Sequence, residues 1–220
     1  MKKLFIITFI AYLFLSGENI IAQEQPPKLK ILSVPQYIFK HGIRMDVELP
    51  SKNYSSWWVF SPQYFIDVSN FGNSNNFGSD EFKRYEQLHG FGFSVHRKNY
   101  FNREHVDKGL YLSGGIGFQH FNILANNEIW VQINEDGLNY MQLIKKNHHV
   151  KINKVLTEAV IGFQKEITSR LYIDIYVGVG LRYSLYDQPS GMDFKLNRNT
   201  IDYGYTGTAF VGGFKVGVGL

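Results

Sequence analysis

The sequence predicts an all-β fold, specifically an eight-stranded antiparallel transmembrane β-barrel. The clearest observation is the stretch LYIDIYVGVGLRYSL, residues 171–185, in which aliphatic residues alternate with polar residues and glycine. Successive side chains of a strand point to opposite faces, so one face of this stretch is apolar and the other is polar. The stretch is long for a soluble strand, but it suits a tilted strand that crosses a bilayer of roughly 30 Å.

The composition is the second observation. The chain has 220 residues, of which 16% are aromatic, with 21 Gly and no Cys. This length allows one domain, and aromatic residues and glycine favour strands with interfacial rings and close backbone contacts. The absence of Cys excludes a disulfide framework and a lipidated cysteine. The formal charge of +4 is spread along the chain, so we expect no nucleic-acid partner.

The N-terminal segment is predicted to be a secretory signal peptide. Two lysines precede an apolar run from Leu4 to Leu15, and polar residues end this run before it is long enough to span a membrane. The expected organisation is a signal peptide at 1–22, a short periplasmic lead at 23–29 and an outer-membrane β-barrel domain at 30–220.

The first four strands follow from alternation and turn residues. Ile43 to Leu49 alternates most clearly, because three charged side chains share one face and apolar side chains share the other. Pro62 lies inside the third strand and predicts a β-bulge, since proline cannot donate to the ladder. A tight turn is expected at His41 and Gly42, and an Asn-rich loop at 69–81. The strands themselves are expected at 30–39, 43–49, 56–68 and 82–97.

The last four strands are expected at 109–121, 150–164, 171–185 and 203–220. Residues 122–149 contain two β-prone runs around a turn at 135–137, so we interpret them as a hairpin extension that projects beyond the membrane. Residues 187–201 form another long polar loop. The third, fifth and seventh connections are therefore long and the second and sixth are short, which predicts that both termini lie in the periplasm.

With these alternating segments, the signal peptide and the C-terminal FKVGVGL at 214–220, the chain resembles small outer-membrane β-barrel proteins of Bacteroidota. In architecture it is similar to the OmpA and OmpX transmembrane barrels. The resemblance implies the outer membrane of a Gram-negative bacterium, contact with outer-membrane lipid and insertion by a Bam-type machinery. Leu220 replaces the terminal aromatic residue of proteobacterial barrels. These families share no catalytic motif, so no functional residue is carried over.

Inward-facing polar side chains form the candidate site, a barrel-interior polar network. Side chains just fill the interior of an eight-stranded barrel, so buried charges there must pair or recruit water. Both signs of charge occur, and we expect a structural polar plug; a binding cavity or a small-solute channel is the alternative. The predicted network is Arg44, Asp46, Glu48, Gln63, Glu158, Asp174, Arg182 and Lys215.

Ser94 and His96 are the residues that would support a hydrolase. Residues two apart on a strand share a face, and a Ser/His pair in a barrel wall is similar to that of lipid A deacylases. The base also needs a third group to orient it, and Glu86 is the candidate for that group. A lipid-modifying outer-membrane hydrolase is therefore the alternative function, and no residue is predicted to be catalytic.

No metal or cofactor site is predicted. His148 and His149 would point to opposite faces of a strand, and no nearby Cys or carboxylate pair completes a ligand set. Aromatic residues near strand ends are typical of interfacial girdles. The candidates are Trp57, Trp58, Tyr64, Tyr172, Tyr183, Tyr203 and Tyr205.

The sequence thus favours a monomeric, non-enzymatic outer-membrane barrel with a structural or interaction role through its extracellular loops. An outer-membrane protein complex is the partner that this role suggests. A soluble lipocalin-like barrel is a further alternative; it would bury the apolar faces and expose Arg44, Asp46 and Glu48.

Overall fold

The computed structural model describes residues 27–52, 56–68, 85–101, 107–135, 138–168, 170–186, 196–200 and 202–220. The predicted signal peptide, the loop at 69–81 and most of the loop at 187–201 lie outside these residues.

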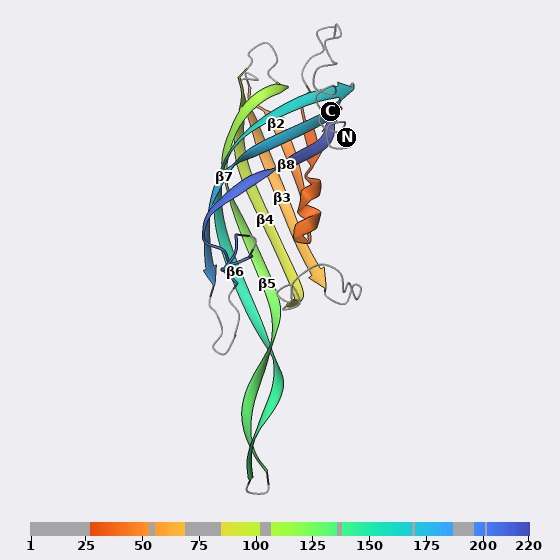
Figure 1. Ribbon diagram of the computed structural model, residues 1–220. Coiled ribbons are helices and arrows are strands. Elements are labelled where there is room, and N and C mark those ends of the chain that lie inside the picture. The colour runs from red at the N-terminus through yellow and green to blue at the C-terminus, as the bar shows by residue number, and fades with distance from the viewer. Residues whose placement is uncertain are drawn as a thin grey trace, which may run out of the picture.

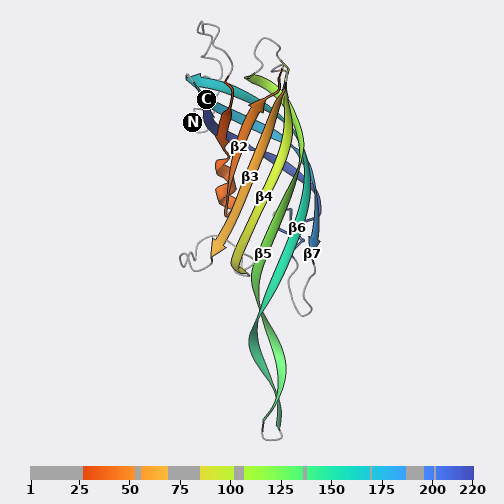
Figure 2. The same ribbon diagram turned by 180° about the vertical axis from the view of Figure 1, so that it is seen from behind.

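In the described part of the chain, eight strands form a closed antiparallel barrel, which confirms the predicted fold class. Each strand pairs with its neighbours in sequence, and β1 pairs with β8 to close the sheet. Figures 1 and 2 show the β5–β6 hairpin projecting from one end of the barrel. We call this the hairpin end, and the opposite end, where Lys28 N donates to Leu220 O at 2.9 Å, the terminal end. The strands are β1 (Lys30–Ser33), β2 (Gly42–Pro50), β3 (Trp57–Val68), β4 (Tyr85–Tyr100), β5 (Gly109–Glu135), β6 (Leu138–Thr168), β7 (Leu171–Tyr186) and β8 (Gly207–Gly219).

The alternation predicted for residues 171–185 is present in β7. Tyr172, Asp174 and Tyr176 are buried inside the barrel, whereas Val177 and Leu181 are exposed on its outer face. The other strands repeat this alternation, so the outer face is apolar, whereas the inner face combines polar, aromatic and aliphatic side chains. Exposed outward residues include Ile43, Trp58, Tyr64, Phe91, Phe93, Leu112, Ile116, Val155, Ile161 and Phe214.

The first strand is much shorter than predicted. β1 ends at Ser33, and the chain then forms a 3₁₀ helix, η1 (Pro35–Lys40). Pro35 has no backbone donor and a fixed φ, which end a strand and suit the first turn of a helix. His41 ends η1 with φ 51°, and the reversal predicted at His41 and Gly42 lies there. No described helix is long and apolar enough to span a membrane.

The predicted bulge at Pro62 is wrong. Pro62 pairs with Phe93 without a register shift between β3 and β4. On the β2 side the paired residues stop at Arg44 and Gln63 and resume in the same register at Val47 and Phe60. The missing donor of Pro62 therefore interrupts one ladder locally, and the strand absorbs it without an extra residue.

The predicted hairpin extension is confirmed and is continuous with the barrel strands. β5 pairs with β4 as far as Ala125, and β6 pairs with β7 only from Ile152 onward. Beyond these points β5 and β6 pair only with each other, out to Glu135 and Leu138. Figures 1 and 2 show this part as a strongly twisted two-stranded ribbon, as expected when no neighbouring strand restrains the twist.

Candidate functional site

The structure places all eight residues of the predicted polar network on the inner face of the barrel. Six of them are buried: Arg44, Asp46, Glu48, Gln63, Asp174 and Lys215. Glu158 on β6 and Arg182 on β7 lie closer to the hairpin end, where both line a pocket. The network therefore has two ion clusters in the barrel interior and a separate group at the hairpin end.

The first ion cluster joins Lys98 to Glu48 and Asp174. The Lys98 Nζ lies 2.9 Å from Glu48 Oε1 and 2.9 Å from Asp174 Oδ2, and all three side chains are buried. Tyr111 donates its hydroxyl to Asp174 Oδ1 at 2.6 Å, and its ring centroid is 4.0 Å from Lys98 Nζ. Two carboxylates surround one ammonium, so the cluster has an excess of negative charge.

The second ion cluster joins Asp46 to Arg44 and Lys215. Arg44 Nε donates to Asp46 Oδ1 at 2.8 Å, and Lys215 Nζ lies 2.8 Å from Asp46 Oδ2. Asp174 of the first cluster pairs in register with Lys215 of the second. Two cations share one carboxylate here, so the excess positive charge balances the neighbouring cluster. Such mutual pairing offsets the cost of removing these charges from water.

Lys30 closes the interior at the terminal end. Its Nζ donates to Gln164 Oε1 at 3.1 Å and lies 4.4 Å from the Trp57 ring centroid and 4.3 Å from that of Tyr172. Both aromatic residues are buried. Their assignment to an outer girdle is therefore wrong, because they stack on a buried cation inside the barrel. The prediction for Tyr203 is also wrong, since this ring packs on Phe121 with its centroid 4.8 Å away.

Sequence reasoning missed Lys30 and Lys98. Lys98 lies one residue beyond the predicted end of the fourth strand, although the period of two continues from Ser94 through His96 to Lys98. Extending that period would have found it. Lys30 begins a strand of only four residues, in which alternation alone does not identify the inner face.

Ser94 and His96 contact each other inside the barrel. The distance between Ser94 Oγ and His96 Nε2 is 3.2 Å, and both residues are buried. Glu158 Oε2 lies 3.9 Å from the same Nε2, so hydroxyl and carboxylate converge on one ring nitrogen. A catalytic triad needs the acid at the other nitrogen, where it orients the base. Gln63 also donates to Ser94 Oγ at 3.4 Å, and the side chain of Glu86 lies outside the described residues.

His148 and His149 lie on opposite faces of β6. His148 is buried, and His149 is exposed. Among the residues that the structure describes, no group of three or more His, Asp or Glu side chains could hold a metal ion.

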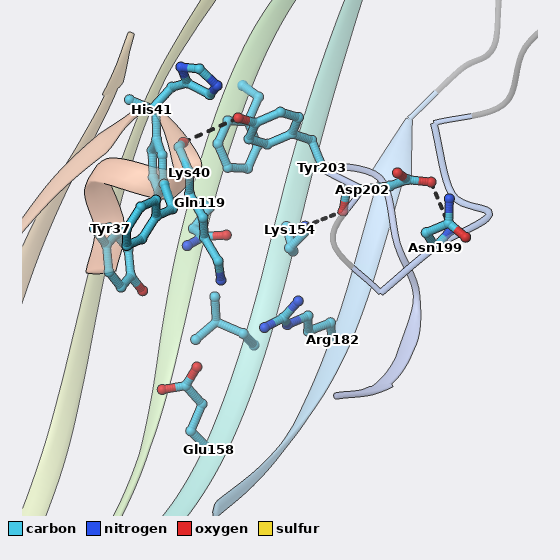
Figure 3. A pocket seen from close by; sticks show the side chains of 14 residues that line it. Tyr37, Lys40, His41, Gln119, Lys154, Glu158, Arg182, Asn199, Asp202 and Tyr203 are labelled. Atoms are coloured by element: carbon cyan, nitrogen blue, oxygen red, sulfur yellow. Dashed lines mark hydrogen bonds between the residues drawn. The ribbon is translucent and has the colours of Figure 1, made fainter. Parts of the chain in front are cut away.

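A pocket of about 180 Å³ lies inside the barrel at the hairpin end. Figure 3 shows it between η1 and the side of the barrel that carries Asn199, Asp202 and Tyr203, with Lys40, Lys154, Glu158 and Arg182 among the charged residues of its wall. The remaining wall is largely aromatic and aliphatic and includes Tyr37, Phe39, Phe65, Phe121, Leu156 and Tyr203. An apolar cluster adjoins the pocket: Phe65, Leu88, Phe121, Ile123, Val150, Ile152 and Leu196.

Comparison with known proteins identifies no family. No protein-family model matches the chain, and no curated protein matches it. Among solved structures, that of Acinetobacter baumannii CarO matches with 11% identity over 91% of this chain and 100% of the CarO chain, at a TM-score of 0.36. So low a score transfers no function to this chain, whose fold follows from its own strand pairing.

Proposed function

We propose that this protein is a non-enzymatic barrel of the Gram-negative outer membrane that binds a protein partner outside the cell through the β5–β6 hairpin. One observation carries the proposal. In the hairpin, the residues of β5 after Ala125 and those of β6 before Ile152 pair only with each other and with no third strand. An isolated two-stranded ribbon is marginally stable in water. A partner that covers the ribbon would supply the burial that the ribbon lacks.

Both faces of the free ribbon carry exposed apolar side chains. Trp130 is 64% exposed and pairs across the strands with Leu143, while Met141 follows on the same face. On the opposite face Leu138 is 72% exposed, with Tyr140 beside it. Clustered exposed apolar residues are typical of protein interaction sites, and Trp and Tyr are frequent hot-spot residues.

The outer face of the barrel supports the membrane location. Large apolar side chains are exposed on it, whereas Arg44, Asp46 and Glu48 are buried. A soluble lipocalin-like barrel would have the reverse arrangement, so these exposures favour the membrane barrel over that alternative. An apolar outer band on a barrel closed by strand pairing is the arrangement that hydrocarbon favours.

The paired charges in the interior support the proposal that the barrel neither conducts solutes nor catalyses a reaction. Two neighbouring ion clusters occupy the barrel interior, and the Ser94–His96 pair has no acid on the second ring nitrogen in the described part of the chain. The proposal retains outer-membrane lipid and a Bam-type machinery as partners and a monomeric barrel. Origin in Bacteroidota and cleavage of residues 1–22 stay predictions.

Membrane insertion is tested by fractionation of cells that express the full chain, followed by gel electrophoresis of unheated and boiled samples. We expect recovery in the outer membrane and a mobility shift on boiling, because the closed barrel stays folded in detergent until it is heated. Recovery in the soluble periplasmic fraction would contradict the membrane proposal.

The hairpin contact is tested by placing a photoreactive residue at Trp130 in native cells, with the same residue at Phe210 as the control. Both side chains are exposed, but Phe210 lies on the outer face of β8, which the proposal assigns to lipid. We expect one discrete protein adduct from position 130, its loss when Leu143 is changed to Ser, and no protein adduct from position 210. Equal adducts from both positions, or none from position 130, would contradict a hairpin-specific partner.

A further inference from the structure

The barrel wall has a seam without strand pairing between β2 and β8. β1 pairs with β8 only at residues 216–219 and with β2 only at residues 45–48. The rest of β8, from Gly207 to Lys215, has no strand on that side among the described pairs. Toward the hairpin end, therefore, the wall lacks the ladder that closes it elsewhere.

The helix η1 occupies this seam (Figure 1, orange helix). Gln36 reaches into the barrel, where its Nε2 donates to Tyr176 OH at 2.9 Å. The same side chain lies against Gly213 of β8, where a Cβ would stand 1.9 Å from Gln36 Nε2. No backbone hydrogen bond joins the described residues of η1 to those of β8. The seam is thus closed by side-chain contacts, which separate more easily than a strand ladder.

The outer surface at the seam is strongly apolar. Phe39 on η1 is 88% exposed, and Phe210 on β8 is 91% exposed. Phe39 also lines the pocket at the hairpin end. The pocket therefore extends to the residues of η1 that lie at the seam.

Three cations around the pocket have no carboxylate partner in the described part of the chain. Arg182 donates to Thr200 O at 2.8 Å, Lys154 lies 3.4 Å from Asp202 O, and the Lys40 ammonium lies 5.6 Å from the Tyr37 ring centroid. The pocket also has two acids. The Asp202 carboxylate accepts from Asn199 N at 2.8 Å, and Glu158 lies 3.9 Å from His96. Lys154 is buried, Arg182 is partly buried and Lys40 is exposed at the rim of the pocket. A buried cation is normally paired with an anion, so three cations around one pocket favour an anionic ligand.

We propose that the pocket binds the anionic head group of a single-chain amphiphile whose alkyl chain lies across the seam between η1 and β8. A volume of about 180 Å³ suits a phosphate or carboxylate head group and is too small for a whole lipid. The aromatic rings at the seam supply the apolar surface for the chain. This ligand site is separate from the hairpin, so its test is independent of the proposed protein partner.

The test measures binding to the purified full chain in a neutral glycoside detergent. The probes are radiolabelled dodecyl phosphate, dodecanoate and inorganic phosphate. We expect dodecyl phosphate or dodecanoate to bind at least tenfold more tightly than inorganic phosphate. Equal affinity for inorganic phosphate, or no binding of either amphiphile, would overturn the proposal.

Charge variants test the pocket itself. Lys154→Met and Arg182→Met should each weaken amphiphile binding at least tenfold, because each removes a cation at the head group. Lys151→Met is the matched control, since Lys151 lies on the same strand but is exposed on the outer face. Unchanged binding by both pocket variants, or equal losses in all three variants, would contradict the site. A heat-dependent mobility shift shows that each variant is folded.

A disulfide tests the seam. In the double variant Gln36→Cys with Gly213→Cys, the two side chains face each other, because a Cβ at position 213 lies 3.2 Å from Gln36 Cγ. The natural chain has no Cys, so this is the only disulfide that can form within one molecule. Oxidation should reduce amphiphile affinity to that of inorganic phosphate, and reduction should restore it. Unchanged amphiphile affinity in the oxidised protein would show that the alkyl chain does not use the seam.

Discussion

Lys98 is the side chain that joins three strands across the barrel interior. Replacing it with Met removes the cation between Glu48 and Asp174 and leaves both buried carboxylates without their ion-pair partner. Loss of one partner from a buried ion pair costs about 3–5 kcal/mol. We therefore expect the Lys98→Met variant to lose about this much free energy of unfolding, measured by urea titration of the barrel in lipid vesicles.

The matched control for Lys98 is its neighbour Arg97, which is exposed and lies 5.8 Å from the Trp58 ring centroid. Arg97→Met should cost less than about 1 kcal/mol. Adding only Glu48→Gln to Lys98→Met should recover most of the loss, because Asp174 then remains beside Lys215 and the two clusters are again balanced. Equal stability of the Lys98→Met and Arg97→Met variants would refute the role given to the cluster.

Two consecutive glycines should respond differently to the same substitution. A Cβ at Gly115 would stand 2.3 Å from Val95 O and 2.5 Å from His96 Cγ, whereas a Cβ at Gly114 meets nothing closer than 3.8 Å. Gly115→Ala should therefore destabilise the barrel by about 1–3 kcal/mol through overpacking, and Gly114→Ala should be nearly neutral. Urea unfolding of the two variants measures the difference, and similar midpoints would contradict the close approach of β4 and β5.

At the scale of single elements, the free part of the hairpin should be dispensable for the barrel. Replacing residues 127–146 with a two-residue Asn-Gly turn removes only pairs between β5 and β6. We expect an unchanged heat-dependent mobility shift and a free energy of unfolding within about 1 kcal/mol of the natural chain, since distant sites contribute independently. Loss of the folded band would show that the hairpin supports the barrel itself.

The sequence is sufficient to predict the boundaries of strands in which one face is uniformly apolar. Ile43 to Leu49 and residues 171–185 were predicted to within a residue or two, because alternation reports directly on which side chains meet the interior. The first strand was overextended, since its β-prone residues continue past Pro35 while backbone chemistry ends the strand there. The partners of Lys98 were beyond sequence reasoning, because β4, β2 and β7 are not all neighbours in the sheet.

At the scale of the whole molecule, the filled interior predicts an absence of ion conduction. The two ion clusters lie side by side, and Lys30 closes the terminal end with Trp57 and Tyr172 around it. Side chains fill an eight-stranded barrel, whereas open channels need more strands. We expect no stepwise conductance above that of protein-free membranes when the protein is reconstituted in a planar bilayer. Discrete, reproducible single-channel steps would contradict the conclusion that side chains close the barrel interior to ions.

The length of the hairpin determines how far its tip stands from the end of the barrel. From Asn126 to Glu135 the free part of β5 spans ten residues in the ladder with β6, which at about 3.3 Å per residue amounts to roughly 30 Å. That span is about the thickness of the hydrocarbon core of a second bilayer. If the barrel lies in the outer membrane as proposed, Leu138 and Tyr140 stand well above the lipid head groups. Such a distance favours a partner that stands above the membrane surface over one confined to the bilayer plane.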